Sequence, residues 1–292
     1  GGCAALQLGG PALRPRNGTS LPGTGAMRPG AATIVVDVGT WQRSEFFDQL
    51  EASGEEGRLW VIAFEPDPRS ASAHPRHPRL ALIEAAVGVS EGGRADLHLT
   101  EWPACNSLLP LSKDAKRLHY DAGPKTTTLL GHCLTPAEQG SLSVRVVPLA
   151  AVLRLLPRGQ EVAFLKIDAQ GSDLAVVLSA GSELGRVRRI QLEVLAPYSA
   201  GDPRMIYDGA ASKLDVIREL AARGFILEAC RQANPDIGEE DCLFVRADLI
   251  SEEARLNTER DLVYGEVRWD RPEEPGHWHE TGLRPLTRAR EA

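Results

Sequence analysis

The chain has 292 residues, a formal net charge of -7 and a sequence pI near 5.6, with 42% hydrophobic and 25% charged residues. This composition is ordinary for a globular protein, and the length suits one well-buried α/β domain with extensions, which we favour over two small domains. The acidic balance argues against a nucleic-acid partner. No apolar run approaches the roughly 20 residues of a membrane helix, so we expect no membrane span.

Regular alternation of strand and helix patterns predicts the fold class. Apolar, β-branched runs predict buried strands at residues 33–38, 59–64, 80–87, 162–167 and 189–194. Further strands are expected at 94–100, 144–147, 225–229 and 243–246. Helical spacing of apolar residues is found at 44–52 (with Ser44 as N-cap), 149–156, 174–179 and 210–223. We therefore predict a doubly wound, mostly parallel α/β sheet of about seven strands.

The predicted domain spans residues 32–247 and is flanked by two extensions. Residues 1–31 contain no Asp or Glu and are rich in Gly, Pro and Ala, as in a disordered leader or linker. The first residue is Gly, so we expect that an upstream segment with any targeting signal has been removed. We favour the cytoplasm, but the sequon at Asn17 keeps a secretory or organellar location open. Residues 248–292 are predicted to be a tail.

Residues 101–143 lose periodicity, and we predict that they form a substrate-side insertion. Within it, His119 and His132 have no evident carboxylate partner, so we expect neither to be a catalytic base.

The five cysteines show no paired spacing typical of metal ligands, and no metal site is expected. Cys230 and Cys242 lie on two predicted neighbouring strands. Two interpretations stay open: a disulfide in an oxidising compartment, or two reduced apolar side chains.

Two strand ends outline a nucleotide-type pocket. The first predicted strand runs into Asp37-Val-Gly-Thr-Trp-Gln-Arg43, which contains a glycine turn, and the second ends at Glu65. In open α/β sheets the ligand lies beyond the carboxyl ends of the strands, near a glycine turn and an acidic residue that binds the ribose. The same edge receives Asp168 and Glu193 from later strands, and we expect Glu193 to be structural.

An ordered set of motifs resembles the FkbM family of S-adenosylmethionine-dependent methyltransferases. The motifs are Val36-Asp-Val-Gly39, Ile62-Ala-Phe-Glu-Pro-Asp-Pro68, Glu84-Ala-Ala-Val-Gly-Val-Ser90, Asn106-Ser-Leu-Leu109 and Leu165-Lys-Ile-Asp-Ala-Gln-Gly-Ser-Asp-Leu174. The resemblance implies a class I methyltransferase (Rossmann-like) fold, S-adenosylmethionine as cofactor, and O-methylation of a hydroxyl on a sugar or small natural product.

The resemblance also assigns roles to particular residues. Asp37, Gly39 and Thr40 would shape the turn beside the methionine part of the cofactor. Glu65, followed by Pro66, would accept hydrogen bonds from both ribose hydroxyls, and Ala86 would lie near the adenine. Asp168 would face the methyl group and the acceptor as a catalytic residue. Lys166 lies two positions earlier on the same strand face and would pair with Asp168.

One departure from the family pattern concerns activity. The family motif reads Asp-Val-Gly-Ala-Asn-x-Gly, whereas this chain has Trp41 and Arg43 in place of small residues. The Trp41 ring could fill the space of the methionine tail, or Arg43 could bind the tail's carboxylate. The alternative to an enzyme is therefore a catalytically inactive binding or scaffold protein. An NAD oxidoreductase is disfavoured because G-x-G-x-x-G is absent.

Overall fold

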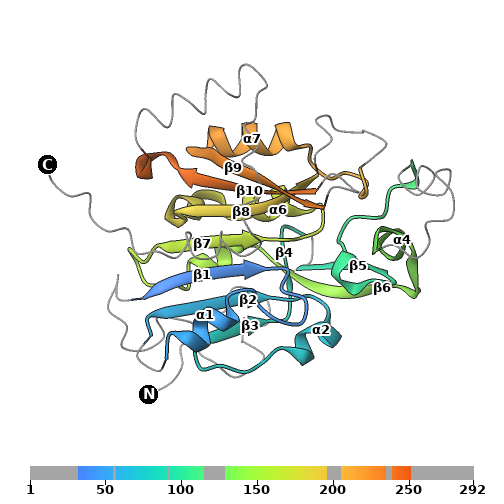
Figure 1. Cartoon of the computed structure of the whole chain (residues 1–292), viewed down its shortest axis with the longest axis horizontal. Coiled ribbons are helices and arrows are strands. Elements are labelled where there is room, and N and C mark those ends of the chain that lie inside the picture. Colours follow the sequence, from blue (N-terminus) through green and yellow to red (C-terminus); the bar gives the residue numbers. More distant parts are fainter. Residues whose placement is uncertain are drawn as a thin grey trace, which may run out of the picture.

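Seven strands form the main sheet of the computed structural model, which describes residues 32–54, 57–90, 93–114, 129–195, 205–234 and 239–250. In sheet order they are β3 (Leu80–Ile83), β2 (Leu59–Phe64), β1 (Thr33–Val38), β7 (Val162–Ile167), β8 (Arg189–Leu195), β10 (Glu239–Arg246) and β9 (Phe225–Asn234). The five from β3 to β8 are parallel, and β10 is antiparallel to both of its neighbours (Figure 1). The prediction of an α/β fold with a mostly parallel central sheet is confirmed.

Helices cover both faces of this sheet. They are α1 (Phe47–Ala52), α2 (Pro68–Ala73), α5 (Leu149–Leu153), α6 (Asp173–Leu178) and α7 (Lys213–Ala222), whereas α4 (Leu129–Leu134) packs against β5 (Arg94–Thr100) of a second sheet. Side chains alternate along β1, so that Ile34 and Val36 join the core under α5, α6 and α7, while Val35 joins the core under α1. Burial on both faces explains why β1 is an almost continuous apolar run. No helix in the described ranges is long and apolar enough to cross a membrane.

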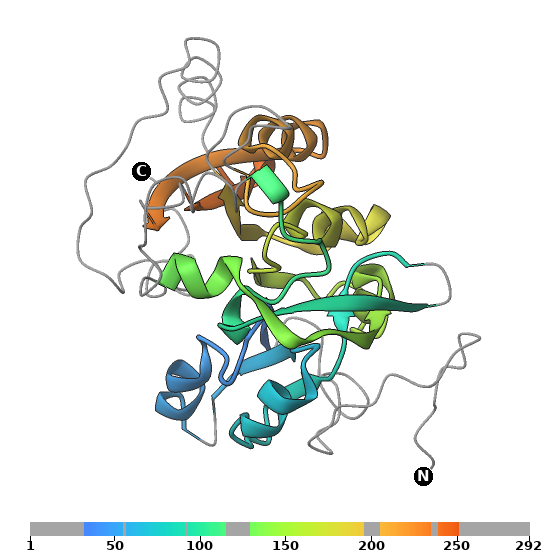
Figure 2. The same cartoon turned by 90° about the vertical axis from the view of Figure 1, so that its right-hand side faces the viewer.

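A second sheet has the order β4 (Ala86–Val87), β6 (Pro136–Val147) and β5 (Arg94–Thr100). It lies on the side of the molecule where β1 and β7 end (Figure 1). In Figure 2 this side faces the viewer, and the green strands β5 and β6 cross in front of the main sheet. The second sheet therefore stands at the carboxyl edge, where ligands bind in open α/β folds.

Two strand predictions were wrong at this second sheet. The predicted strand 80–87 is divided, because β3 ends at Ile83 and β4 belongs to the second sheet. The strand predicted to begin at residue 144 begins at Pro136, inside the predicted insertion. Most of residues 136–143 are exposed and polar, so pairing with β5 rather than apolar burial defines this part of the strand. The insertion also contains α4 and a short 3-10 helix, η2 (Pro103–Cys105).

Helix starts also differ from prediction. The expected N-cap Ser44 lies before α1, whose N-cap is Phe46, and the Ser44 hydroxyl instead donates to Asp37 Oδ2 at 2.6 Å. At α7 the N-cap is Ser212, which forms a capping box with Asp215. The leader 1–31 and almost all of the predicted tail, from residue 251 onward, lie outside the described residues, as do Asn17 and His119.

Two disulfides lie within the described part of the chain. Cys230 and Cys242 face each other on β9 and β10 and are bonded, which selects one of the two interpretations left open by the sequence. The second joins Cys105 of η2 to Cys133 of α4, a pair that the sequence analysis missed. It lies in the segment without apolar periodicity, where no pattern could align the two cysteines.

A buried ion pair connects α7 to the main sheet. Lys213 and Glu240 form a salt bridge, and their side chains are only 1% and 2% exposed. Removing one partner from a buried pair typically lowers the free energy of unfolding by about 3–5 kcal/mol, whereas replacing both with apolar groups can be neutral. In urea unfolding we expect Glu240→Leu to lower the free energy of unfolding by at least about 3 kcal/mol. We expect the double variant with Lys213→Met and Glu240→Leu to recover most of this loss. A double variant no more stable than the single one would contradict this.

Candidate active site

A pocket of about 270 Å³ lies at the carboxyl ends of β1, β2 and β7. Eight of the nine predicted site residues line it, namely Gly39, Thr40, Arg43, Glu65, Pro66, Ala86, Lys166 and Asp168. The ninth, Asp37, is fully buried behind the pocket wall. Apolar lining comes from Val87 and Leu97 of the second sheet and from Ala85 and Leu108, which lie outside its strands. The two sheets together therefore enclose the space that the sequence analysis assigned to a ligand.

Gly39 brings the end of β1 into direct contact with the end of β7. Its φ is +78°, and a Cβ at this position would lie 1.8 Å from the Asp168 carbonyl oxygen. The Asp168 N–H also donates to the Val38 carbonyl at 2.9 Å. No side chain fits between these two backbones, so glycine is required on both conformational and steric grounds.

Backbone strain is concentrated at the same pocket. Among the described residues, Trp41 (φ +48°) and Gln170 (φ +50°) are the non-glycine residues with positive φ, and both line the pocket. The Trp41 ring lies 5.7 Å, centroid to centroid, from the ring of Trp102. Such outliers persist where the surrounding structure holds them and are common at functional sites.

Thr40 and His74 fix the turn that carries Trp41. The Thr40 hydroxyl lies 2.8 Å from His74 Nε2, which is 3.1 Å from the Trp41 carbonyl oxygen. Burial lowers the pKa of His74, so that the neutral imidazole is favoured. The predicted binding residue Thr40 thus also has a structural role.

Glu65 presents a buried carboxyl group to the pocket. The residue is 6% exposed, and its carboxylate accepts hydrogen bonds from the backbone N–H groups of Asp67, at 2.9 Å, and of Trp41. Burial raises the pKa of Glu65 to about 8, against the opposing effect of these hydrogen bonds. A ligand hydroxyl in the pocket would offset this desolvation by donating to the carboxylate.

Lys166 is a buried cation among three carboxylates. Its Nζ lies 3.0 Å from Glu45 Oε1, 3.2 Å from Asp168 Oδ2 and 3.9 Å from Asp37 Oδ1. The predicted contact with Asp168 is therefore present. Burial alone would lower the pKa of Lys166, but the carboxylates raise it well above its usual value. Burial also raises the pKa of Asp37 to about 6, although Lys166 and the Ser44 hydroxyl oppose the shift.

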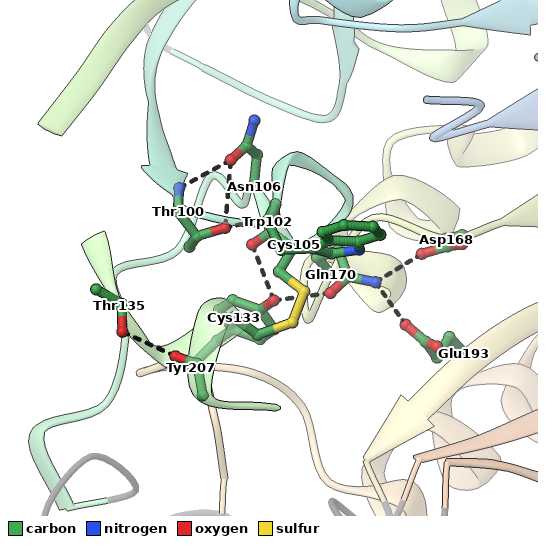
Figure 3. The surroundings of a disulfide bond; sticks show 11 residues. Thr100, Trp102, Cys105, Asn106, Cys133, Thr135, Asp168, Gln170, Glu193 and Tyr207 are labelled. Atoms are coloured by element: carbon green, nitrogen blue, oxygen red, sulfur yellow. Dashed lines mark hydrogen bonds between the residues drawn. A yellow bond between two sulfur atoms is a disulfide. The ribbon is translucent and has the colours of Figure 1, made fainter. Parts of the chain in front are cut away.

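Gln170 bridges Asp168 to a second carboxylate. Its Nε2 donates to Asp168 Oδ1 at 2.8 Å and to Glu193 Oε2 at 2.9 Å (Figure 3). The Tyr207 hydroxyl lies 2.7 Å from Gln170 Oε1 and 3.0 Å from the Cys105 carbonyl oxygen. Figure 3 shows this network beside the Cys105–Cys133 disulfide. Sequence reasoning missed Gln170 and Tyr207, because Tyr207 stands in no motif and Gln170 was noted only as part of one.

Other predicted residues lie differently from expectation. The Arg43 guanidinium contacts Asp48, stands 3.9 Å from Glu51 and lies over the Phe47 ring, so its charge is directed toward α1. His132, for which the sequence suggested no partner, has its Nδ1 2.9 Å from Glu101 Oε2. Both groups of this His–Glu pair are about half exposed and neither lines the pocket.

A comparison with protein families identifies the family of the chain. The family model described as the methyltransferase FkbM domain matches residues 34–227. The chain belongs to the FkbM methyltransferase family. The resemblance predicted from the sequence motifs is confirmed.

A similar solved structure is a methyltransferase FkbM from Methylobacillus flagellatus KT, at 14% identity and a TM-score of 0.40. The match covers 80% of this chain and 48% of that protein, so the chain spans about half of its length. No protein with a curated description matches the chain.

The close approach at Gly39 leads to a stability prediction with an internal control. Gly39→Ala places a methyl group against the Asp168 backbone, which cannot move as a flexible side chain would. Gly54 also has a positive φ of +62°, but a Cβ there would meet nothing within 4 Å. Left-handed backbone costs a non-glycine residue about 1–2 kcal/mol. We expect Gly54→Ala to lose about that much in denaturant unfolding and Gly39→Ala clearly more. Equal losses would show that the contact is unimportant.

The buried carboxyl groups predict the pH dependence of stability. Burial raises the pKa of Glu65 and Glu239 to about 8 and that of Asp173 to about 7, well above the ordinary values of these carboxyl groups. Between pH 5 and 8 the folded state therefore binds protons that the unfolded state has lost, and stability falls as pH rises. We expect Glu239→Gln to reduce this slope by up to about 1.4 kcal/mol per pH unit.

The matched control is Asp248→Asn. The pKa of Asp248 is lowered, mainly by its hydrogen bonds with Arg246, so this group stays ionised in both states across the same pH range. Its replacement should leave the slope unchanged. Wild-type stability that is flat or rises between pH 5 and 8 would contradict the prediction.

Proposed function

We infer that the protein transfers the methyl group of S-adenosylmethionine to a hydroxyl oxygen. The observation that carries this proposal is the buried Glu65 carboxylate. Glu65 follows the last residue of β2 and lines the same pocket as the Gly39 turn. A carboxylate at this place can accept hydrogen bonds from both hydroxyls of a ribose. The order of the main sheet, with β10 reversed near one edge, supports the predicted class I methyltransferase type of fold.

The pocket residues fit the parts of this cofactor. Glu65 and Pro66 would hold the ribose, and the apolar wall of Ala86, Val87 and Leu97 suits the adenine ring. The Gly39 turn would lie beside the methionine part, where the absence of a side chain leaves the backbone accessible. Arg43 lines the same region, but its contact with Asp48 argues against a strong interaction with the methionine carboxylate.

We assign to Asp168 the role of base, which accepts the proton of the acceptor hydroxyl. The cofactor, when bound, supplies an electrophilic methyl group on its sulfonium sulfur. Asp168 is partly exposed to the pocket, with 34% of its side chain accessible, and Lys166 and Gln170 hold one oxygen each. A carboxylate restrained in this way can orient a hydroxyl for in-line attack and take up its proton as the oxygen is methylated. Lys166 compensates the negative charge.

The alternative of an inactive scaffold rests on Trp41 and Arg43. Trp41 lines the pocket, and about 270 Å³ stays open beside it, which favours a binding role over a blocked site. We therefore keep the enzyme as the first proposal.

The two disulfides bear on the compartment. Disulfides persist in oxidising compartments and are rare in the cytosol, so Cys105–Cys133 and Cys230–Cys242 favour a secretory or comparable location over the cytoplasm favoured from sequence. The acceptor would then be a small molecule or glycan of that compartment.

Calorimetric titration with S-adenosylmethionine tests the proposal. We expect saturable binding by the wild type and about tenfold weaker binding by Glu65→Gln, because the amide retains only one of the two acceptor oxygens. The matched control is Glu219→Gln on the exposed side of α7, where an i,i+4 pair with Arg223 contributes little. Absence of binding by wild-type protein at millimolar cofactor would exclude the enzyme and favour the scaffold.

A further inference from the structure

Two exposed tryptophans stand together at the pocket. Trp41 and Trp102 are each 37% exposed, and they are the aromatic residues among the large exposed apolar side chains of the described chain. Their ring centroids are 5.7 Å apart and their planes are inclined by 46°. Trp41 lines the pocket, and Pro103 and Ala104, which follow Trp102, line it too. The pair therefore forms an apolar corner beside the region that holds Asp168.

The backbone of Trp41 is held so that its ring stays in this position. Its N–H donates to the Glu65 carboxylate, and its carbonyl oxygen lies 3.1 Å from His74 Nε2. The φ of +48° is unfavourable for a residue with a side chain. A large side chain that is 37% exposed and stands on strained backbone contributes little to the stability of the fold, which points to a role in binding.

Trp102 is held from the other side of the pocket. It is the N-cap of η2, and its carbonyl oxygen accepts a hydrogen bond from the Thr100 hydroxyl at 2.6 Å. The same short helix is anchored at Cys105 by the disulfide to Cys133 and by the Tyr207 hydroxyl. Both rings thus stand on restrained backbone, and an ordered aromatic surface loses little entropy when a ligand binds.

The polar groups around this corner select the chemistry of the ligand. Asp168 lines the pocket, and each of its carboxylate oxygens accepts one hydrogen bond, from Lys166 or Gln170, and has a further lone pair for a ligand donor. The two cations that line the pocket, Lys166 and Arg43, already contact carboxylates, and together with the net charge of -7 this disfavours an anionic ligand. A ring with an apolar C–H face and hydroxyl donors at its edge matches both the indoles and the acceptors.

We propose that Trp41 and Trp102 form the platform for the methyl acceptor, and that the acceptor presents a neutral carbohydrate ring. The inference rests on the proposed methyltransferase function. The indoles contact one face of the ring, while Asp168 and Gln170 contact its hydroxyl edge. Because Trp41 also donates its N–H to Glu65, it contributes to the proposed cofactor site through its backbone and to the acceptor site through its ring. Trp41 and Trp102 are thus specificity-determining residues.

Binding of methyl glycosides to the full chain tests this platform. The probes are the methyl pyranosides of glucose, galactose, mannose and N-acetylglucosamine, each titrated by calorimetry with saturating S-adenosylhomocysteine present. We expect at least one to bind, and Trp102→Ala and Trp41→Gly to weaken that binding at least tenfold. Glycine at position 41 keeps the positive φ. Trp102→Phe retains an aromatic face and should stay within about threefold of the wild type.

The matched control is Trp60→Phe, on β2, since Trp60 does not line the pocket. It should bind the glycoside as the wild type does. Titration with S-adenosylmethionine is run on each variant, and Trp102→Ala should retain its cofactor affinity. The titration with S-adenosylmethionine separates failure of the platform from failure of the proposed function, because absence of cofactor binding by the wild type would reject the methyltransferase function itself.

Three results would overturn the inference. They are no binding of any glycoside by cofactor-competent protein, unchanged glycoside binding in Trp102→Ala, and binding of methyl glucuronide as tight as that of the neutral glycosides. Binding of 4-methylcatechol that exceeds every glycoside and depends on Trp102 would replace the carbohydrate with an aromatic acceptor.

Discussion

The contact between the Gly39 turn and the Asp168 backbone is the constraint on which the rest of the site depends. It brings the ends of β1 and β7 together without an intervening side chain, and so sets the distance between the proposed cofactor turn and the proposed catalytic carboxylate. Trp41, which follows this turn, has a strained backbone conformation with positive φ, and so has Gln170, which follows β7. Strain on both sides of one backbone contact indicates that a close approach is maintained at some expense to stability.

Electrostatics around this contact follow from burial. The positive charge of Lys166 compensates the carboxylates of Asp37, Glu45 and Asp168. Glu193 lies near other carboxylates instead, and its burial, together with the negative charge of Asp168, raises the pKa of Glu193 well above its usual value. Gln170 donates one N–H to each of Asp168 and Glu193 and so separates two groups that would repel each other if both were ionised. The site thus combines an acidic interior with a single buried cation in its wall.

Local patterns predicted the parts of this protein whose structure is determined by apolar burial. The strands β1, β2 and β7 were evident as short apolar runs, and Glu65 and Asp168 followed from their positions at strand ends. The first half of β6 is exposed and was missed, because only its pairing with β5 makes it a strand. Contacts between distant segments, such as Trp41 with Trp102 and Gln170 with Tyr207, leave no local pattern and required the structure.

The Cys105–Cys133 disulfide has a consequence for how the pocket wall is stabilised. In the described part of the segment that it closes, Leu108, Leu109 and Leu111 pack against two small apolar clusters rather than against the main core. In the chain-entropy view, a cross-link between residues 28 positions apart restricts the unfolded chain and adds about 3–4 kcal/mol to stability. A covalent loop closure therefore stabilises this wall as hydrophobic packing stabilises the sheet, and the apolar side chains of the wall can remain exposed to a ligand.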